Sequence, residues 1–148
     1  MFIIDGKEVS NKIKTELKTI IDKENLTPGL GIILVGERED SKVYVNMKKK
    51  ACNKLGIRNI DFKLDEDVSE TELIKTVESM NNNDSIHGIL IQLPLPKHIN
   101  TQNVLSKVSI EKDVDGFHAQ SMGNLAINNN NVKYFAPCTP EGCMELLR

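Results

Sequence analysis

The stretch LGIILV, from Leu30 to Val35, is apolar almost without interruption and follows the helix-breaking sequence Thr27-Pro28-Gly29. An apolar run of this length predicts a strand that is buried on both faces, as in a parallel sheet. We expect two more strands further along the chain, one around 60–64 with alternating apolar residues and a buried one from Ile86 to Gln92.

Helical periodicity fills the intervals around these strands. Apolar residues recur on one face of a helix from Gly6 to about Lys23, and a second helix from Asp40 to Lys54 is expected to end at Gly56. A capping-box pattern opens a third helix over 69–80. The order strand, helix, strand, helix, strand predicts an α/β fold in which helices cover both faces of a parallel sheet, giving three layers.

The periodic pattern loosens after Gln92, where Pro94 and Pro96 exclude a further central strand. The elements expected next are a short helix over 101–107, a tight turn over 113–116, a solvent loop over 128–131 and a helix over 140–148. No repeat or long linker divides the chain, so we expect residues 1–148 to form one domain.

The composition is typical of a globular protein, with 39% apolar and 27% charged residues and a net charge of −2. This charge argues against binding to nucleic acid or to an anionic membrane. We expect a cytoplasmic protein, because no apolar run is long enough to span a bilayer and the first residues lack a signal-peptide pattern. Three cysteines without a CxxC pair argue against a disulfide framework or a structural zinc site.

Candidate site residues are sought beyond the carboxyl ends of the strands, where open α/β sheets bind their ligands. The helix after the first strand carries Tyr44 and Lys48 four residues apart, with Ser41 one turn before Tyr44. This spacing places an aromatic ring and an amine on one helix face, where both can act on one ligand. The alternative is that Lys48 belongs, with Lys49 and Lys50, to a solvated helix face.

Gln92 ends the third predicted strand and is followed by Leu93-Pro94-Leu95-Pro96. The prolines fix the backbone here, so the Gln92 amide can be held in one orientation. This amide then lies either in the cleft or in solvent at the edge of the sheet.

The segment Asp113-Val114-Asp115-Gly116-Phe117 places two carboxylates beside a glycine. A carboxylate can accept two parallel hydrogen bonds from an amidine-like edge, such as that of a pterin. The alternative is an Asx turn. We expect no metal site, because no further carboxylates or histidines stand at ligand spacing nearby.

Other reactive side chains are assigned no chemistry. His87, His98 and His118 are isolated histidines, and Cys138 has no evident base beside it, so we expect Cys138 to be a packed thiol. The glycines do not fit G-x-G-x-x-G and no Walker motif occurs. A flavodoxin-like nucleotide binder is therefore disfavoured, and we expect no cofactor-binding residue within this chain.

Four motifs follow an opening Ile4-Asp5-Gly6 and extend over nearly the whole chain. They are Tyr44-Val45-Asn46-Met47-Lys48 with Gly56-Ile57, Gln92-Leu93-Pro94-Leu95-Pro96, Asp113-Val114-Asp115-Gly116-Phe117 and Pro137-Cys138-Thr139-Pro140. Together they resemble the bifunctional methylenetetrahydrofolate dehydrogenase/methenyltetrahydrofolate cyclohydrolase family. The resemblance implies that residues 1–148 are the N-terminal, folate-binding catalytic domain of a two-domain fold, without its C-terminal NAD(P)-binding Rossmann domain.

The resemblance also implies roles for individual residues. The implied catalytic residues are Lys48, its partner Gln92 and Tyr44, which packs on the folate, and the implied substrate contacts are Asp115 on the pterin edge, Tyr44, Ser41, Gln92, Leu93 and Pro94. The family pattern has an asparagine two positions before Gly123 and often a basic residue after it, where this chain has Ser121 and Asn124.

For function, the resemblance implies NADP-dependent oxidation of 5,10-methylenetetrahydrofolate and hydrolysis of the product to 10-formyltetrahydrofolate. Such an enzyme is an oxidoreductase and hydrolase of one-carbon metabolism that serves purine biosynthesis, here expected as a cytoplasmic homodimer. Because hydride transfer needs a nicotinamide, this chain alone is expected to be at most a cyclohydrolase. The alternative is a non-catalytic module that binds folate or a partner polypeptide.

If a partner domain covers the last helix, an apolar patch near Met144, Leu146 and Leu147 is exposed here.

Overall fold

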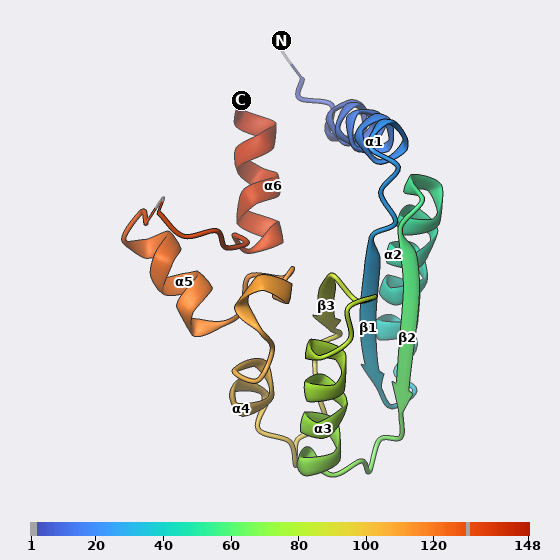
Figure 1. Ribbon diagram of the computed structural model, residues 1–148, viewed down its shortest axis with the longest axis vertical. Coiled ribbons are helices and arrows are strands. Elements are labelled where there is room, and N and C mark those ends of the chain that lie inside the picture. The colour runs from blue at the N-terminus through green and yellow to red at the C-terminus, as the bar shows by residue number, and fades with distance from the viewer. Residues whose placement is uncertain (1–2, 130) are drawn as a thin grey trace.

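A three-stranded parallel sheet lies at the centre of the computed structural model, which describes residues 3–129 and 131–148. The strands are β1 (Gly29–Val35), β2 (Arg58–Leu64) and β3 (Gly88–Ile91), in the order β2-β1-β3. Helix α2 (Glu39–Leu55) connects β1 to β2, and α3 (Glu70–Asn81) connects β2 to β3. Figure 1 shows α2 behind the sheet and α3 in front of it, which confirms the predicted three-layer α/β fold.

The two faces of β1 belong to two separate cores, because successive side chains of a strand point to opposite faces. Ile32 and Leu34 pack with Val45 of α2 and with Leu90 of β3. The larger core lies on the other face and contains Ile33, Val35, Ile89 and Ile91 of the sheet, Leu73, Val77 and Met80 of α3, and Val68, Ile86, Ile99, Val104, Leu105 and Val108 around them. A strand with apolar side chains on both faces is therefore covered twice, as its sequence predicts.

Local sequence signals set the ends of the first three helices. Asp5 caps α1 (Gly6–Lys23) by accepting hydrogen bonds from two backbone N–H groups of its first turn. Gly56 ends α2 with φ of 83°, a left-handed conformation that favours glycine. The hydroxyl of Ser69 accepts a hydrogen bond from the Glu72 N–H at 3.2 Å, which is one half of the predicted capping box.

The later elements differ from the prediction in length and number. β3 is shorter than predicted, although the N–H groups of His87 and Gln92 still donate to carbonyls of β1 at 2.8 and 2.9 Å. The remaining helices are α4 (Thr101–Leu105), a 3-10 helix (Ile110–Lys112), α5 (Ala119–Ala126) and α6 (Cys138–Leu147). The 3-10 helix and α5 are absent from the prediction. Helix α5 contains Gly123 and Asn124, which have low helix propensity. In the predicted loop 128–131, Asn128 and Asn131 are exposed, and Asn130 lies outside the described residues.

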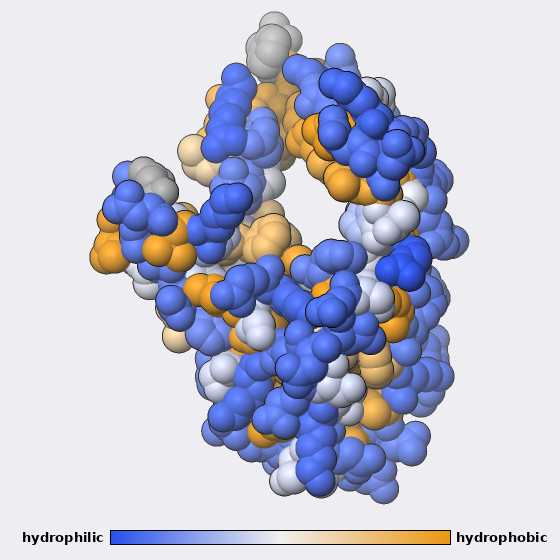
Figure 2. Space-filling view, in the orientation of Figure 1, coloured by the Kyte–Doolittle hydropathy of each residue, from blue (hydrophilic) through white to orange (hydrophobic). Residues whose placement is uncertain are grey.

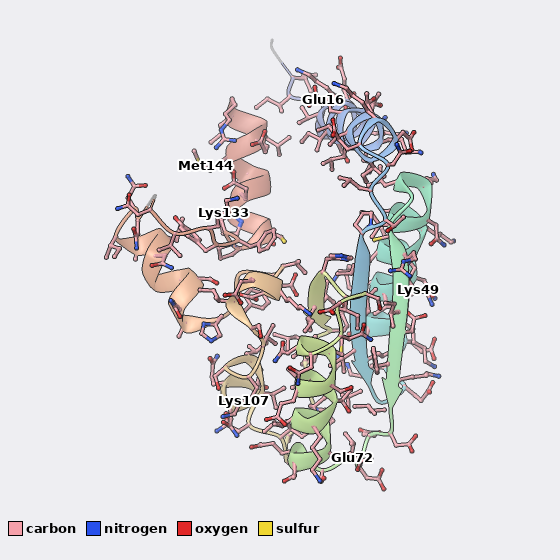
Figure 3. The ribbon with its side chains drawn as sticks, in the orientation of Figure 1. Glu16, Lys49, Glu72, Lys107, Lys133 and Met144 are labelled. Carbon is pink, nitrogen blue, oxygen red and sulfur yellow. The ribbon has the colours of Figure 1, made fainter. Side chains whose placement is uncertain are left out.

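Helices α1 and α6 lie apart from the sheet core, near both chain ends (Figure 1). The structure describes every residue of α1 and α6, and none of these residues is buried. Figure 2 shows hydrophobic side chains of α1 facing an opening between α1 and α6. The predicted exposure of Met144, Leu146 and Leu147 is confirmed, but Met144 and Leu146 lie on different sides of α6. Leu146 approaches Gly6 of α1, whereas Met144 projects away from α1 (Figure 3).

Candidate functional site

Lys48 of α2 and Gln92, the residue that follows β3, meet beside the carboxyl end of β3. The Lys48 amine donates a hydrogen bond to Gln92 Oε1 at 3.1 Å. The other end of the same amide, Gln92 Nε2, donates to the Leu93 carbonyl at 2.9 Å. Leu93 packs against the larger core, and a cis peptide bond joins it to the exposed Pro94. Because its nitrogen is bonded to the backbone, the Gln92 amide presents its oxygen to Lys48, as the proline-rich exit from β3 predicts.

The three consecutive lysines of α2 have three different environments. Lys49 forms an ion pair with Asp61 of β2, and Figure 3 shows it beside that strand. Lys50 is exposed and lines a groove between α1 and α2. Lys48 is partly buried and turns toward the end of the sheet. The alternative of a common solvated face therefore fits Lys50 alone.

Asp113 and Asp115 also differ in environment, although only one residue separates them. Asp113 is 4% exposed. Its carboxylate accepts hydrogen bonds from the Phe117 N–H at 3.2 Å, the His118 N–H at 2.9 Å and the Ser121 hydroxyl at 2.9 Å. The donors lie four, five and eight residues after Asp113, so these hydrogen bonds are not those of the Asx turn considered as the alternative.

Asp115 is the aspartate that remains available to a ligand. Partial burial raises the pKa of its carboxyl group above the ordinary value, the nearby Lys48 opposes this shift, and Asp113 adds to it. Among the ion pairs of the described residues, none joins Lys48 to Asp115. The structure therefore groups one amine, one amide and one partly buried carboxylate near the carboxyl end of β3.

Gly116 fixes the position of the Asp115 turn against the segment that leads into α6. Its φ of 67° favours glycine, and its N–H donates to the Asp113 carbonyl at 3.2 Å. A Cβ atom at this position would lie 2.6–2.7 Å from backbone atoms of residues 135–137. This close approach brings Cys138, the first residue of α6, to Asp115.

Tyr44 and Ser41 lie on the same helix as Lys48 but differ in exposure. Tyr44 is 59% exposed, so one face of its ring is open to a ligand one helical turn from Lys48. Ser41 is only 3% exposed, and its backbone N–H donates to the Asp40 carboxylate at 2.8 Å. Of the residues selected from sequence, the structure thus brings Lys48, Gln92 and Asp115 together, with Tyr44 on their border and Ser41 below the surface.

A family model described as tetrahydrofolate dehydrogenase/cyclohydrolase, catalytic domain, matches residues 4–115, which include all three of these grouped residues. The chain belongs to this folate enzyme family. The match begins just before α1 and ends at Asp115. Relatives and solved structures extend the similarity to the rest of the chain.

Known members of the tetrahydrofolate dehydrogenase/cyclohydrolase family match almost the whole chain. The bifunctional protein FolD 2 of Arabidopsis thaliana is 48% identical over 98% of this chain and 50% of its own length. The crystal structure of the FolD enzyme of Campylobacter jejuni superimposes with a TM-score of 0.93 at 41% identity, covering 99% of this chain and 52% of that one. The Trypanosoma brucei enzyme, solved with NADP cofactor and inhibitor, has a TM-score of 0.89 at 36% identity over 99% and 51%. The chain spans about half the length of the relatives it matches.

Ser121 and Asn124, on either side of Gly123 in α5, are both removed from solvent. Ser121 is completely buried and donates its hydroxyl hydrogen bond to Asp113. Asn124 is also buried and accepts a hydrogen bond from the side chain of Asn129 at 3.1 Å. Neither Ser121 nor Gly116 is among the site residues predicted from sequence. The signal available was a serine eight residues after Asp113, with a turn glycine between them.

Cys138 corrects an expectation from the sequence. We expected a packed thiol, but the structure has an exposed cysteine at the start of α6. Its Sγ donates to the Val114 carbonyl at 3.4 Å and more weakly to Asp115 Oδ1 at 3.9 Å. Partial burial of the sulfur, followed by the negative charge of Asp115, raises the pKa of the thiol. The sequence could not reveal that Cys138 lies beside Asp115, because this placement depends on how closely the backbone of residues 135–137 packs against Gly116.

The 148-residue sequence contains neither a G-x-G-x-x-G pattern nor a Walker motif, so no step is assigned to a nucleotide held by this chain. Among residues 3–129 and 131–148, no group of three potential ligands is arranged to hold a metal ion. No helix in the same ranges is long and apolar enough to cross a membrane.

Proposed function

We propose that this chain forms the folate-binding half of an enzyme that oxidises 5,10-methylenetetrahydrofolate to 5,10-methenyltetrahydrofolate and hydrolyses the latter to 10-formyltetrahydrofolate. The observation that carries this proposal is the Lys48–Gln92 hydrogen bond beside Asp115, in a chain that belongs to the family. We assign Lys48, Gln92 and Tyr44 to catalysis. Asp115, Tyr44, Ser41, Gln92, Leu93 and Pro94 are assigned to substrate binding.

In the hydrolytic step, Lys48 serves as the base. Methenyltetrahydrofolate carries a formamidinium-like cation, and water adds to its carbon while the neutral Lys48 amine takes a proton from that water. Return of that proton to the departing ring nitrogen allows the carbon–nitrogen bond to break. The hydroxyl group on the carbon releases its own proton to solvent as it becomes a carbonyl, and the formyl group is left on the other nitrogen. Gln92 orients the amine through its oxygen without adding a charge, whereas a carboxylate here would favour the ammonium form.

Substrate recognition is divided between a carboxylate and an aromatic ring. The Asp115 carboxylate accepts two parallel hydrogen bonds from the 2-amino and ring N–H groups of the pterin. The exposed ring of Tyr44 packs on the flat, cationic part of the substrate, an interaction worth about 0.5–2 kcal/mol depending on desolvation. Leu93 and Pro94 provide the neighbouring wall of the site, and Ser41 lies one helical turn before Tyr44 in α2.

The oxidative step is proposed to require a second domain. Residues 1–148 form the folate-binding domain, and we assign NADP binding to a separate Rossmann domain, consistent with relatives that are about twice as long. Held by that domain against the substrate, NADP would supply the hydride acceptor for the methylene carbon. The 148-residue chain alone is therefore proposed to hydrolyse methenyltetrahydrofolate at most.

A direct test follows the loss of methenyltetrahydrofolate absorbance with the 148-residue chain. Wild type should exceed the background rate, Lys48→Ala should reduce the decay to background, and the exposed neighbour Lys50→Ala should behave as wild type. Equal decay with wild type and Lys48→Ala would exclude Lys48 as the hydrolytic base. If wild type binds a folate in calorimetry without turning it over, the non-catalytic folate-binding module is the better description.

The proposal places the complete enzyme in the cytoplasm as a homodimer that supplies 10-formyltetrahydrofolate to purine biosynthesis. The net charge of −2 supports a small-molecule substrate rather than nucleic acid or a membrane surface. Sedimentation of the complete enzyme at several concentrations measures whether it is a dimer. Cell fractionation measures its location.

A further inference from the structure

The turn that carries Asp115 contains a second aspartate, Asp113, which points into the protein. We propose that Asp113, held by Ser121, is a positioning residue that fixes the turn in the conformation in which Asp115 faces the folate. This inference rests on the proposed function, since it concerns how the assigned pterin anchor is held in place. It assigns roles to two residues that do not touch the substrate.

Burial makes the hydrogen bonds of Asp113 obligatory. Within the described residues, Asp113 takes part in no ion pair, yet its carboxylate is almost completely removed from solvent. A buried carboxylate is stable only when donors compensate for its lost hydration. Two backbone N–H groups and the hydroxyl of Ser121 provide this compensation at 2.9–3.2 Å.

These bonds connect the turn to the rigid elements on either side of Asp115. On the sheet side, Asp113 forms a parallel bridge with Ile89 of β3, and Lys112 donates to three carbonyls at the end of α3. On the other side, the Asp113 carboxylate is bonded to His118, which caps α5, and to Ser121 within α5. Asp115 therefore lies in a loop whose two ends are held. Loss of the Ser121 bond removes one of the three hydrogen bonds that the Asp113 carboxylate accepts.

Asp113 affects Asp115 through charge as well as through geometry. The charged or titratable groups that act on Asp115 are Lys48 of α2, Cys138 of α6 and Asp113 of its own turn. Burial is the largest cause of the raised pKa of Asp115, Lys48 and Cys138 lower it, and Asp113 raises it. A residue that merely stabilised the fold would leave the pH dependence of folate binding unchanged, whereas removal of the Asp113 charge should move it.

The test measures the affinity of the 148-residue chain for 5-formyltetrahydrofolate, a stable reduced folate, by calorimetry between acidic and neutral pH. Ser121→Ala should weaken binding roughly tenfold at neutral pH, as expected for loss of a hydrogen bond to a charged group. Ser85→Ala is the matched control, because it removes a similar hydroxyl bond, to Asn83 at 2.7 Å, before the amino end of β3. Asp113→Asn should shift the acid midpoint of binding to lower pH, because Asp115 then loses a like-charged neighbour.

The outcomes separate this inference from the proposed function. If the wild-type chain binds the folate and a folded Ser121→Ala binds it equally well, the positioning role of the Asp113–Ser121 pair is overturned. An unchanged acid midpoint in a folded Asp113→Asn would overturn the electrostatic part. If Asp113→Asn does not fold, Ser121→Ala decides the question alone. Failure of wild type to bind the folate would overturn the proposed function, and this inference with it.

Discussion

The Lys48 amine donates to Gln92 Oε1 at 3.1 Å across 44 residues of sequence. The contact forms because α2 follows β1, Gln92 ends β3, and the two strands are parallel neighbours in the sheet. The amide nitrogen of Gln92 is bonded to the Leu93 carbonyl, so the oxygen is the part of the amide that faces the amine. Because the Gln92 amide is uncharged, Lys48 and Gln92 form a hydrogen bond and not an ion pair.

Replacing Gln92 by glutamate should impair hydrolysis while preserving the shape of the site. The new carboxylate would hold the Lys48 amine in its charged form, so a smaller fraction could act as a base at neutral pH. We expect Gln92→Glu to lower the rate of methenyltetrahydrofolate hydrolysis roughly tenfold or more and to move the pH–rate profile to higher pH. Gln102→Glu, on the exposed part of α4, is the control. A Gln92→Glu protein with an unchanged pH–rate profile would count against Lys48 as the base.

Asparagine at position 115 should increase stability and decrease folate binding. The pKa of Asp115 is raised chiefly by burial, so the folded chain keeps this proton at pH values where the unfolded chain releases it. Stability therefore falls as pH rises from the ordinary carboxyl pKa through the raised value, and at neutral pH the charge of Asp115 is destabilising. Asp115→Asn removes this destabilising charge. The urea concentration at the unfolding midpoint should therefore be higher for the variant than for wild type at neutral pH.

The same Asp115→Asn substitution should weaken 5-formyltetrahydrofolate binding at least about tenfold, because an amide cannot accept two parallel hydrogen bonds. Urea unfolding and calorimetry measure the two effects. Asp84→Asn, an exposed position before β3, should change neither. A loss of stability in Asp115→Asn would show that its attraction to Lys48 outweighs its burial.

Two glycine-to-alanine substitutions should have opposite effects on stability. At Gly116, a Cβ would meet the backbone of residues 135–137 at 2.6–2.7 Å in a left-handed conformation, so Gly116→Ala should destabilise the chain by about 2 kcal/mol or more. At Gly123, in the middle of α5, a Cβ would meet no atom within 4 Å. Gly123→Ala should therefore stabilise the chain by about 0.5–1 kcal/mol. Urea unfolding measures both, and equal effects would contradict the close approach at Gly116.

Alkylation of Cys138 should depend on pH and on the folate. Its raised pKa keeps it a thiol at neutral pH, so iodoacetamide should modify it slowly there and faster as pH rises. Because the sulfur lies beside Asp115, bound 5-formyltetrahydrofolate should protect it, and the modified chain should bind the folate more weakly. Peptide mass spectrometry follows Cys138 together with Cys143, the exposed cysteine of the same helix, as an internal reference. Equal protection of both cysteines would argue against a site at Asp115.

Much of the fold follows from sequence because its signals are local. The apolar run from Leu30 to Val35 specified a strand covered on both faces, and Gly56 specified the end of α2. Helix α5 could not be predicted, since Gly123 and Asn124 weaken its helical signal and it is held by the capping of His118 and the bond from Ser121 to Asp113. These are contacts formed only in the folded chain.

By itself, the sequence determined which residues could carry chemistry, because Tyr44 and Lys48 share a helix face and Gln92 and Asp115 follow at strand ends or turns. Only the tertiary structure decided how each of them is placed. It turned Lys48 toward Gln92, buried Asp113 while leaving Asp115 available, and exposed Cys138. Adjacent residues such as Lys48 and Lys49 have the same local propensities, and they differ because burial and hydrogen-bond partners come from segments far away in the chain.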